Sequence, residues 1–140
     1  MKNSTMGFTL VELIIVLAIV AIIGAILIPN FLNTTDRARL RSDIQSARVL
    51  QNALELHNVE QPTPISPEAS IQIIKNTLDS LGYIDARRVA VQTHGAYFTR
   101  SSDGQIVLNI SNATSNSVRT NLYEQLSHQE RNYVIRGTAD

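Results

Sequence analysis

The residue with the clearest chemical demand in this sequence is Glu12, the one charged side chain among residues 7–28. A carboxylate placed among apolar side chains is costly in lipid or in a protein interior unless a partner satisfies it. This segment holds no basic side chain. The sequence therefore predicts that Glu12 finds its partner outside its own helix, and the chemistry expected there is ion pairing.

The apolar run around Glu12 predicts a helix of membrane length. At 1.5 Å per residue, residues 8–28 span about 31 Å, close to the thickness of a bilayer core. A secretory signal would need an apolar core of about 7–15 residues and a small-x-small exit site. Residues 13–28 are already uninterrupted apolar or glycine residues, and no such site follows before Pro29. A plain single-pass anchor stays open as an alternative, but it gives Glu12 no role.

The first residues also carry a resemblance. Residues 1–17 resemble the N-terminus of the type IV pilin and pseudopilin superfamily, through a short basic leader with Lys2, the leader's last residue Gly7, and the sequence Phe8-Thr9-Leu10-Val11-Glu12-Leu13. Pro29 lies where these helices typically carry a proline, and the resemblance covers about the first 55 residues. It implies cleavage by a prepilin peptidase between Gly7 and Phe8 and methylation of the Phe8 amine. It also implies pairing of Glu12 with the Phe8 ammonium of a neighbouring subunit.

One long helix is expected from about Thr9 to about His57. After Pro29 a single apolar stripe continues at helical spacing, formed by Leu40, Ile44, Ala47, Leu50 and Leu54. Asp43 and the charged residues near it are expected on other faces. Gly24 and Pro29 weaken the helix, so residues 24–29 are predicted to kink, and the resemblance implies that they melt in a filament.

Beyond the helix the sequence predicts a small α+β domain. Ser66 and Pro67 begin a predicted helix over 67–81. Three antiparallel strands are expected, followed by a helix over 117–129 and a further short strand at 133–135; the three strands are 88–92, 96–100 and 105–110. With the resemblance, the expected fold is a pilin-like lollipop of four parts: a cleaved leader (1–7), a membrane or filament-core half-helix (8–28), an amphipathic half-helix (29–58) and a globular domain (59–140).

Catalytic and metal-binding patterns are missing from the sequence. It has no cysteine and no tryptophan, and no phosphate-binding loop, dinucleotide fingerprint or HExxH motif occurs. His57, His94 and His128 are isolated, and Asp103-Gly104 is interpreted as a turn rather than a calcium loop. We therefore expect no catalytic residue, metal or cofactor. The absent tryptophan also departs from the Trp-Gly-x-Pro-Tyr pattern of major secretion pseudopilins.

Four arginines follow the apolar run and admit several interpretations: Arg37, Arg39, Arg41 and Arg48. They could touch lipid phosphates, or pair with acids of adjacent subunits such as Glu55 or Glu60. DNA binding is disfavoured, because the 12 basic residues are balanced by 12 acidic ones. The positive-inside bias would place these arginines in the cytoplasm, whereas the resemblance implies that the C-terminal domain lies outside.

The resemblance implies a structural function rather than an enzyme. The expected protein is a single-pass membrane subunit that polymerises through its N-terminal helix into an extracellular homo-oligomeric filament. Its implied partners are the prepilin peptidase, an inner-membrane platform protein and an assembly ATPase system. The alternative is a minor pilin or pseudopilin of a type II secretion or competence system, acting in initiation, adhesion or DNA binding.

Overall fold

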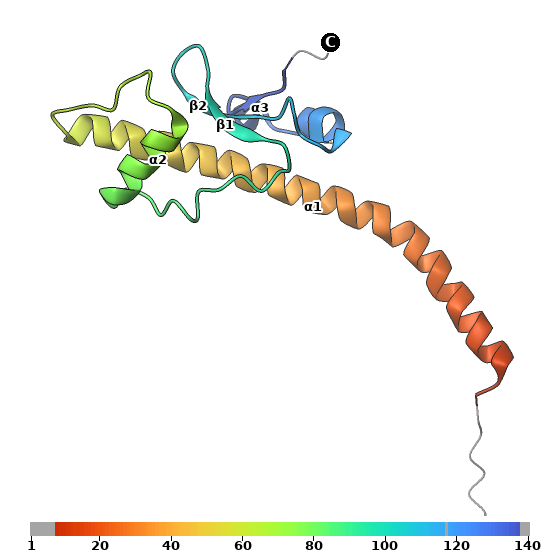
Figure 1. Ribbon diagram of the computed structural model, residues 1–140. Coiled ribbons are helices and arrows are strands. Elements are labelled where there is room, and N and C mark those ends of the chain that lie inside the picture. Colours follow the sequence, from red (N-terminus) through yellow and green to blue (C-terminus); the bar gives the residue numbers. More distant parts are fainter. Residues whose placement is uncertain (1–7, 117, 138–140) are drawn as a thin grey trace, which may run out of the picture. The chain divides into compact units, whose positions relative to one another are not determined.

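The computed structural model describes residues 8–116 and 118–137, so the leader with Gly7 lies outside the described residues. The chain divides into two units, Met1–Thr35 and Asp36–Asp140. Its elements, in chain order, are α1 (Leu10–Glu60), α2 (Ile71–Ser80), β1 (Tyr97–Arg100), β2 (Ile106–Asn109), the π-helix η1 (Val118–Leu122), α3 (His128–Arg131) and β3 (Val134–Ile135) (Figure 1).

Helix α1 confirms the predicted long helix and extends three residues beyond His57. The backbone is helical throughout, including Gly24 and Pro29. Because proline has no N–H, the carbonyl of Ala25 lacks its usual intrahelical donor. The structure shows no break at this point, so melting of residues 24–29 in a filament stays a prediction.

The core of the second unit is built on the predicted stripe of α1. All five stripe residues are buried, and the core has two clusters that lie one after the other along the helix. The first cluster joins Leu40 and Ile44 to β2, β3 and residues 113–126. The second joins Leu50, Ala53 and Leu54 to α2, Val89 and Ile106. Each fully buried aliphatic side chain contributes about 1.5–3 kcal/mol to the stability of the fold. The stripe therefore holds the rest of the second unit against the second half of α1.

The sheet differs from the predicted meander. Strands β1 and β2 pair antiparallel, with Phe98 opposite Leu108, as expected. The predicted strand 88–92 is wrong, because the amides of Arg88 and Val89 donate to the Asp85 carbonyl and form a turn. The third strand is β3, the short segment expected at 133–135, and it pairs parallel to β2. The domain is therefore α+β with a small mixed sheet.

Helix α2 is confirmed with a shifted start, whereas the helix predicted over 117–129 is not a continuous α-helix. Helix α2 begins at Ile71 rather than Pro67, because the Ser70 side chain accepts from the Ile73 amide and caps the helix. Ser66 instead forms a tight turn, in which its carbonyl accepts from the Ala69 amide. The helix predicted over 117–129 is present as two pieces, η1 and α3, and its first residue, Ser117, lies outside the described part. A new cap at Ser127 starts α3.

Candidate functional site

The first half of α1 presents an apolar surface that no other described residue covers. Phe8 is 83% exposed, and the large apolar side chains from Leu10 to Ile28 are at least half exposed. In the part of the chain that the structure describes, α1 is the helix long and apolar enough to cross a membrane, and its most apolar stretch has no buried residue. That exposure distinguishes α1 from the core helix of a soluble protein, which has the same composition but is buried.

Glu12 has hydrogen-bond partners in its own chain, which corrects the prediction that none would lie there. The backbone amide and the hydroxyl of Thr9 both donate to Glu12 Oε2 at 2.9 Å. In return the Glu12 amide donates to Thr9 Oγ1 at 3.2 Å. This arrangement is a capping box, in which the first turn of a helix satisfies its own free donors. The sequence signal for this pair is the Thr-x-x-Glu spacing at the start of an apolar run.

The partner that the resemblance implies for Glu12 is of a different kind. Thr9 supplies neutral hydrogen-bond donors, whereas the amine of Phe8 would supply a positive charge. The bond between Gly7 and Phe8 lies at the edge of the described residues, so processing there, methylation of Phe8 and its pairing with Glu12 stay predictions. A cut at that bond leaves the Thr9 amide intact, and the capping box survives it.

Gly24 has no packing role inside the single chain. A methyl group added at its Cα would meet nothing within 4 Å. Small residues on membrane helices commonly allow a second helix to approach closely. Within the described residues the space beside Gly24 is open.

Asp43 has a structural role in the fold. Its predicted position on a polar face of the helix was wrong. Its side chain is fully buried. Oδ1 accepts from the Gln92 amide at 2.8 Å, and Oδ2 accepts from the Thr93 amide at 2.7 Å. The signal was present in the spacing, since Asp43 lies three residues after Leu40 and four before Ala47 on the buried stripe. The carboxylate fixes the loop that was predicted to be a strand.

All four arginines of α1 contact residues of their own domain, three through a hydrogen bond or an ion pair and the fourth through an aromatic ring. Arg37 donates to the Gln125 side chain, and Arg39 lies 3.9 Å from Asp36. Arg41 lies 3.6 Å from Glu130. Arg48 stacks on Tyr133, with its Cζ 4.9 Å from the ring centroid. These contacts do not support a free basic face for nucleic acid.

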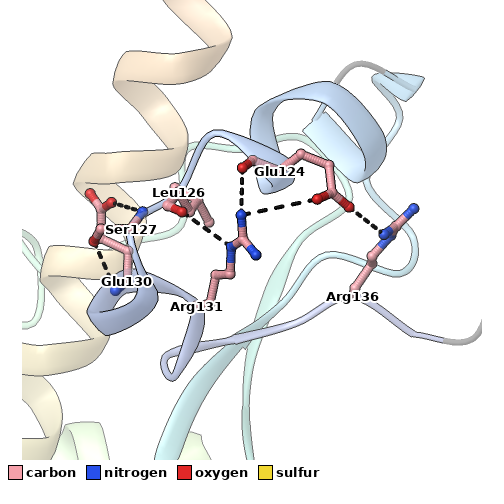
Figure 2. A network of polar contacts seen from close by, with 6 residues as sticks. All are labelled: Glu124, Leu126, Ser127, Glu130, Arg131 and Arg136. Atoms are coloured by element: carbon pink, nitrogen blue, oxygen red, sulfur yellow. Dashed lines mark hydrogen bonds and ion pairs between the residues drawn. The ribbon is translucent and has the colours of Figure 1, made fainter.

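A polar network holds the segment that follows η1 (Figure 2). Arg131 donates to the carbonyls of Leu126 and Glu124, and the Glu124 carboxylate accepts from Arg136 at 3.0 Å. Beside it Ser127 and Glu130 form a capping box. The hydrogen bond from the Ser127 amide is the main cause that lowers the pKa of Glu130, followed by the Ser127 side chain and the charge of Arg41.

The histidines do not assemble into a metal site. His57 is buried, and its ring meets the Tyr83 ring edge to face at 5.5 Å. Across residues 8–116 and 118–137, no group of three or more His, Cys, Asp or Glu residues is placed to hold a metal ion.

Comparison with known proteins gives partial matches. The chain is 40% identical over 55 residues to "Prepilin peptidase-dependent protein A" of Clostridium perfringens, covering 39% of each chain. It is 38% identical over 74 residues to "Type IV wide pilus major component PilA4" of Thermus thermophilus, covering 51% of this chain and 53% of that protein. It is 25% identical over 73 residues to "Type II secretion system core protein G" of Klebsiella michiganensis, covering 52% and 51%.

The chain thus spans about half or less of the length of the curated relatives it matches. No family model matches it, and no solved structure matches it.

Proposed function

Because this chain belongs to the type IV pilin and pseudopilin superfamily, we propose that it is a structural subunit of a type IV pilus or pilus-like filament. It is not an enzyme. In this proposal the leader is removed between Gly7 and Phe8, the Phe8 amine is methylated, and the mature subunits polymerise through the first half of α1.

The observation that carries the proposal is the uncovered apolar half of α1 with a carboxylate in its first turn. An apolar surface of this length needs lipid or other copies of the chain around it. Moving it from lipid into a bundle of such helices gives little hydrophobic gain, because both surroundings are apolar. Register and direction must then come from shape and from the buried charge.

The capping box suggests how Glu12 is accommodated before assembly. In the membrane the Thr9 amide and hydroxyl satisfy the carboxylate at 2.9 Å, so a lone subunit does not carry an unpaired charge. On assembly the ammonium of a neighbour's Phe8 offers a stronger, charge-assisted partner. The difference between the two partners favours the assembled state and selects the position of the next subunit.

The proposed location follows from the same features. The subunit spans the membrane once with its C-terminal domain outside the cytoplasm, and then joins a cell-surface filament. In this proposal the topology implied by the family outweighs the positive-inside bias of the arginines that follow the apolar run. The proposed partners are the prepilin peptidase, a platform protein and an assembly ATPase system.

A second candidate is a pseudopilin of a type II secretion or competence system, or a minor pilin. It is favoured by the similarity to two secretion proteins, at 25% and 24% identity. Abundance separates the candidates, since a major pilus subunit dominates sheared filaments, whereas a minor subunit is a trace component.

The proposal is tested by shearing cells, imaging the filaments by cryo-electron microscopy and determining the subunit mass. We expect a mature chain that starts at methylated Phe8, in filaments whose core consists of α1 helices. A protein that keeps Met1 and stays monomeric in the membrane would contradict the proposal.

A further inference from the structure

The two halves of the second unit carry opposite charge. Residues 36–48 and 107–137, around the first core cluster, hold seven arginines and four carboxylates. Residues 49–106, around the second cluster, hold six carboxylates and four basic side chains. We call these regions the basic half and the acidic half. A separation of charge along one chain is a feature that can steer the basic half of one copy toward the acidic half of another.

The basic half contains a cavity of about 270 Å³ lined by Arg48, Gln129, Asn132 and Tyr133. Arginine and amide side chains supply N–H donors, and the tyrosine supplies a hydroxyl. Within the described residues the Arg48 guanidinium makes no hydrogen bond or ion pair, and its Nε is buried without a partner. The guanidinium stacks on the Tyr133 ring, and its charge also acts on nearby Glu130, whose carboxylate accepts from the Ser127 amide and lies 3.6 Å from Arg41. This set of donors fits a carboxylate.

The acidic half offers one carboxylate without a partner. Among the acidic residues that the structure describes, Glu68 alone has a side chain with no hydrogen bond or ion pair, and it is exposed. The turn that carries it is fixed, because the Ser66 carbonyl accepts from the Ala69 amide at 3.0 Å. Arg100 also donates to the Pro67 carbonyl. Lys75, on α2 in the same half, does not pair with Glu68.

We propose that the Arg48 cavity of one copy receives the Glu68 carboxylate of another copy. The inference rests on the proposed filament function and deepens it. The two patches differ and lie on the same chain, so the contact is heterologous and can repeat without closing, as a helical filament requires. Because the turn that carries Glu68 is already ordered in the single chain, its insertion into the Arg48 cavity costs little conformational entropy.

Charge reversal in the full-length chain tests the pairing. Arg48→Glu and Glu68→Arg should each lower the yield of sheared filaments several-fold, and the double variant should restore it. Restoration separates pairing from a folding defect, because Glu68→Arg cannot repair a domain that Arg48→Glu has unfolded. Arg87→Glu is the matched control, since Arg87 is almost fully exposed on a different loop, and it should leave the yield unchanged.

Cysteine cross-linking gives an independent measurement, because the chain has no cysteine of its own. Filaments that carry both Glu68→Cys and Gln129→Cys should form disulfide-linked ladders on oxidation, and filaments with either cysteine alone should give no ladder beyond dimers. Wild-type filaments that form normally, together with no restoration and no ladder, would overturn this inference and leave the proposed function standing. Absence of any wild-type filament would instead overturn the proposed function.

Discussion

Thr9 and Glu12 close a reciprocal pair of hydrogen bonds at the first turn of α1, with both Thr9 donors 2.9 Å from one carboxylate oxygen. This pair gives the exposed Glu12 carboxylate a partner within its own chain. Under the proposed function, residence in the membrane and contact with a neighbouring subunit then place separate demands on Glu12. The two demands can be distinguished by substitution.

Glu12→Val should insert in the membrane at the normal level and assemble poorly, because valine needs no partner in lipid and offers none to Phe8. Thr9→Val should lower the level of the unassembled subunit in the membrane, since it removes the hydroxyl donor from Glu12. Membrane fractionation and sheared-filament yield measure the two stages. Normal filament yield from Glu12→Val would contradict the pairing role.

Gly7→Leu should block processing, because the resemblance implies that the peptidase requires glycine before the cut. The expected subunit mass is that of the uncleaved chain, with no methylation of Phe8. Gly24→Ala is the matched control for processing, since its added methyl group meets nothing in the chain, and mass spectrometry should find it cleaved normally. Loss of the first seven residues from Gly7→Leu would show that the site lies elsewhere.

Asp43→Asn should destabilise the second unit by about 1–3 kcal/mol, the usual range for leaving a buried donor unsatisfied. The amide can accept from only one of the two backbone N–H groups of Gln92 and Thr93. Asp36→Asn is the control, because its ion pair with Arg39 is long and partly exposed and contributes about 0–1 kcal/mol. Hydrogen exchange of the full chain in detergent should show faster exchange at Gln92 and Thr93 only for Asp43→Asn.

Gly95→Ala and Gly104→Ala form a matched pair for the second unit. Both glycines have positive φ, 81° and 84°, where a side chain costs about 1–2 kcal/mol. At Gly95 the new Cβ would also lie 2.1 Å from the Asn112 carbonyl oxygen, whereas at Gly104 it meets nothing within 4 Å. Thermal unfolding should show a clearly larger loss of stability for Gly95→Ala. Equal losses would mean that the loop before β1 moves away from Asn112.

Glu130 should make the stability of the second unit sensitive to acid. Its pKa is lowered in the folded chain, first by the hydrogen bond from the Ser127 amide. A carboxyl with a lowered folded pKa stabilises above its unfolded pKa, and this contribution is lost as the pH falls through the folded pKa. Glu130→Gln should therefore lower stability at neutral pH and flatten its decline in acid. Glu68→Gln, which removes a carboxylate without partners in the single chain, should leave the decline unchanged.

Much of the helical architecture was predictable, because it rests on local periodicity. The stripe from Leu40 to Leu54 recurs at helical spacing, and its burial follows from that spacing alone. The turn at residues 101–104 likewise places β1 beside β2, since hairpin pairing is local in sequence.

Several failures depend on partners far away in the chain. Residues 88–92 have the composition of a strand, but Asp43, 49 residues before Gln92, accepts the amides of Gln92 and Thr93. Whether β3 runs parallel or antiparallel to β2 depends on the path of the chain through η1 and α3. No short sequence pattern predicts that path. Glu12 is a different case, because its partner Thr9 lies only three residues before it. The Thr-x-x-Glu pattern that indicates this pair is visible in the sequence.

The parallel contact between β2 and β3 has a consequence for the order of events in the cell. The amides of Leu108 and Ile110 donate to the carbonyls of Tyr133 and Ile135, so the sheet is completed by residues that are synthesised after η1 and α3. If this domain is exported behind α1 as it leaves the ribosome, its sheet cannot close until residues 133–135 have crossed the bilayer. In that case β1 and β2 lack their third strand until then, and the domain is open to proteolysis during that interval.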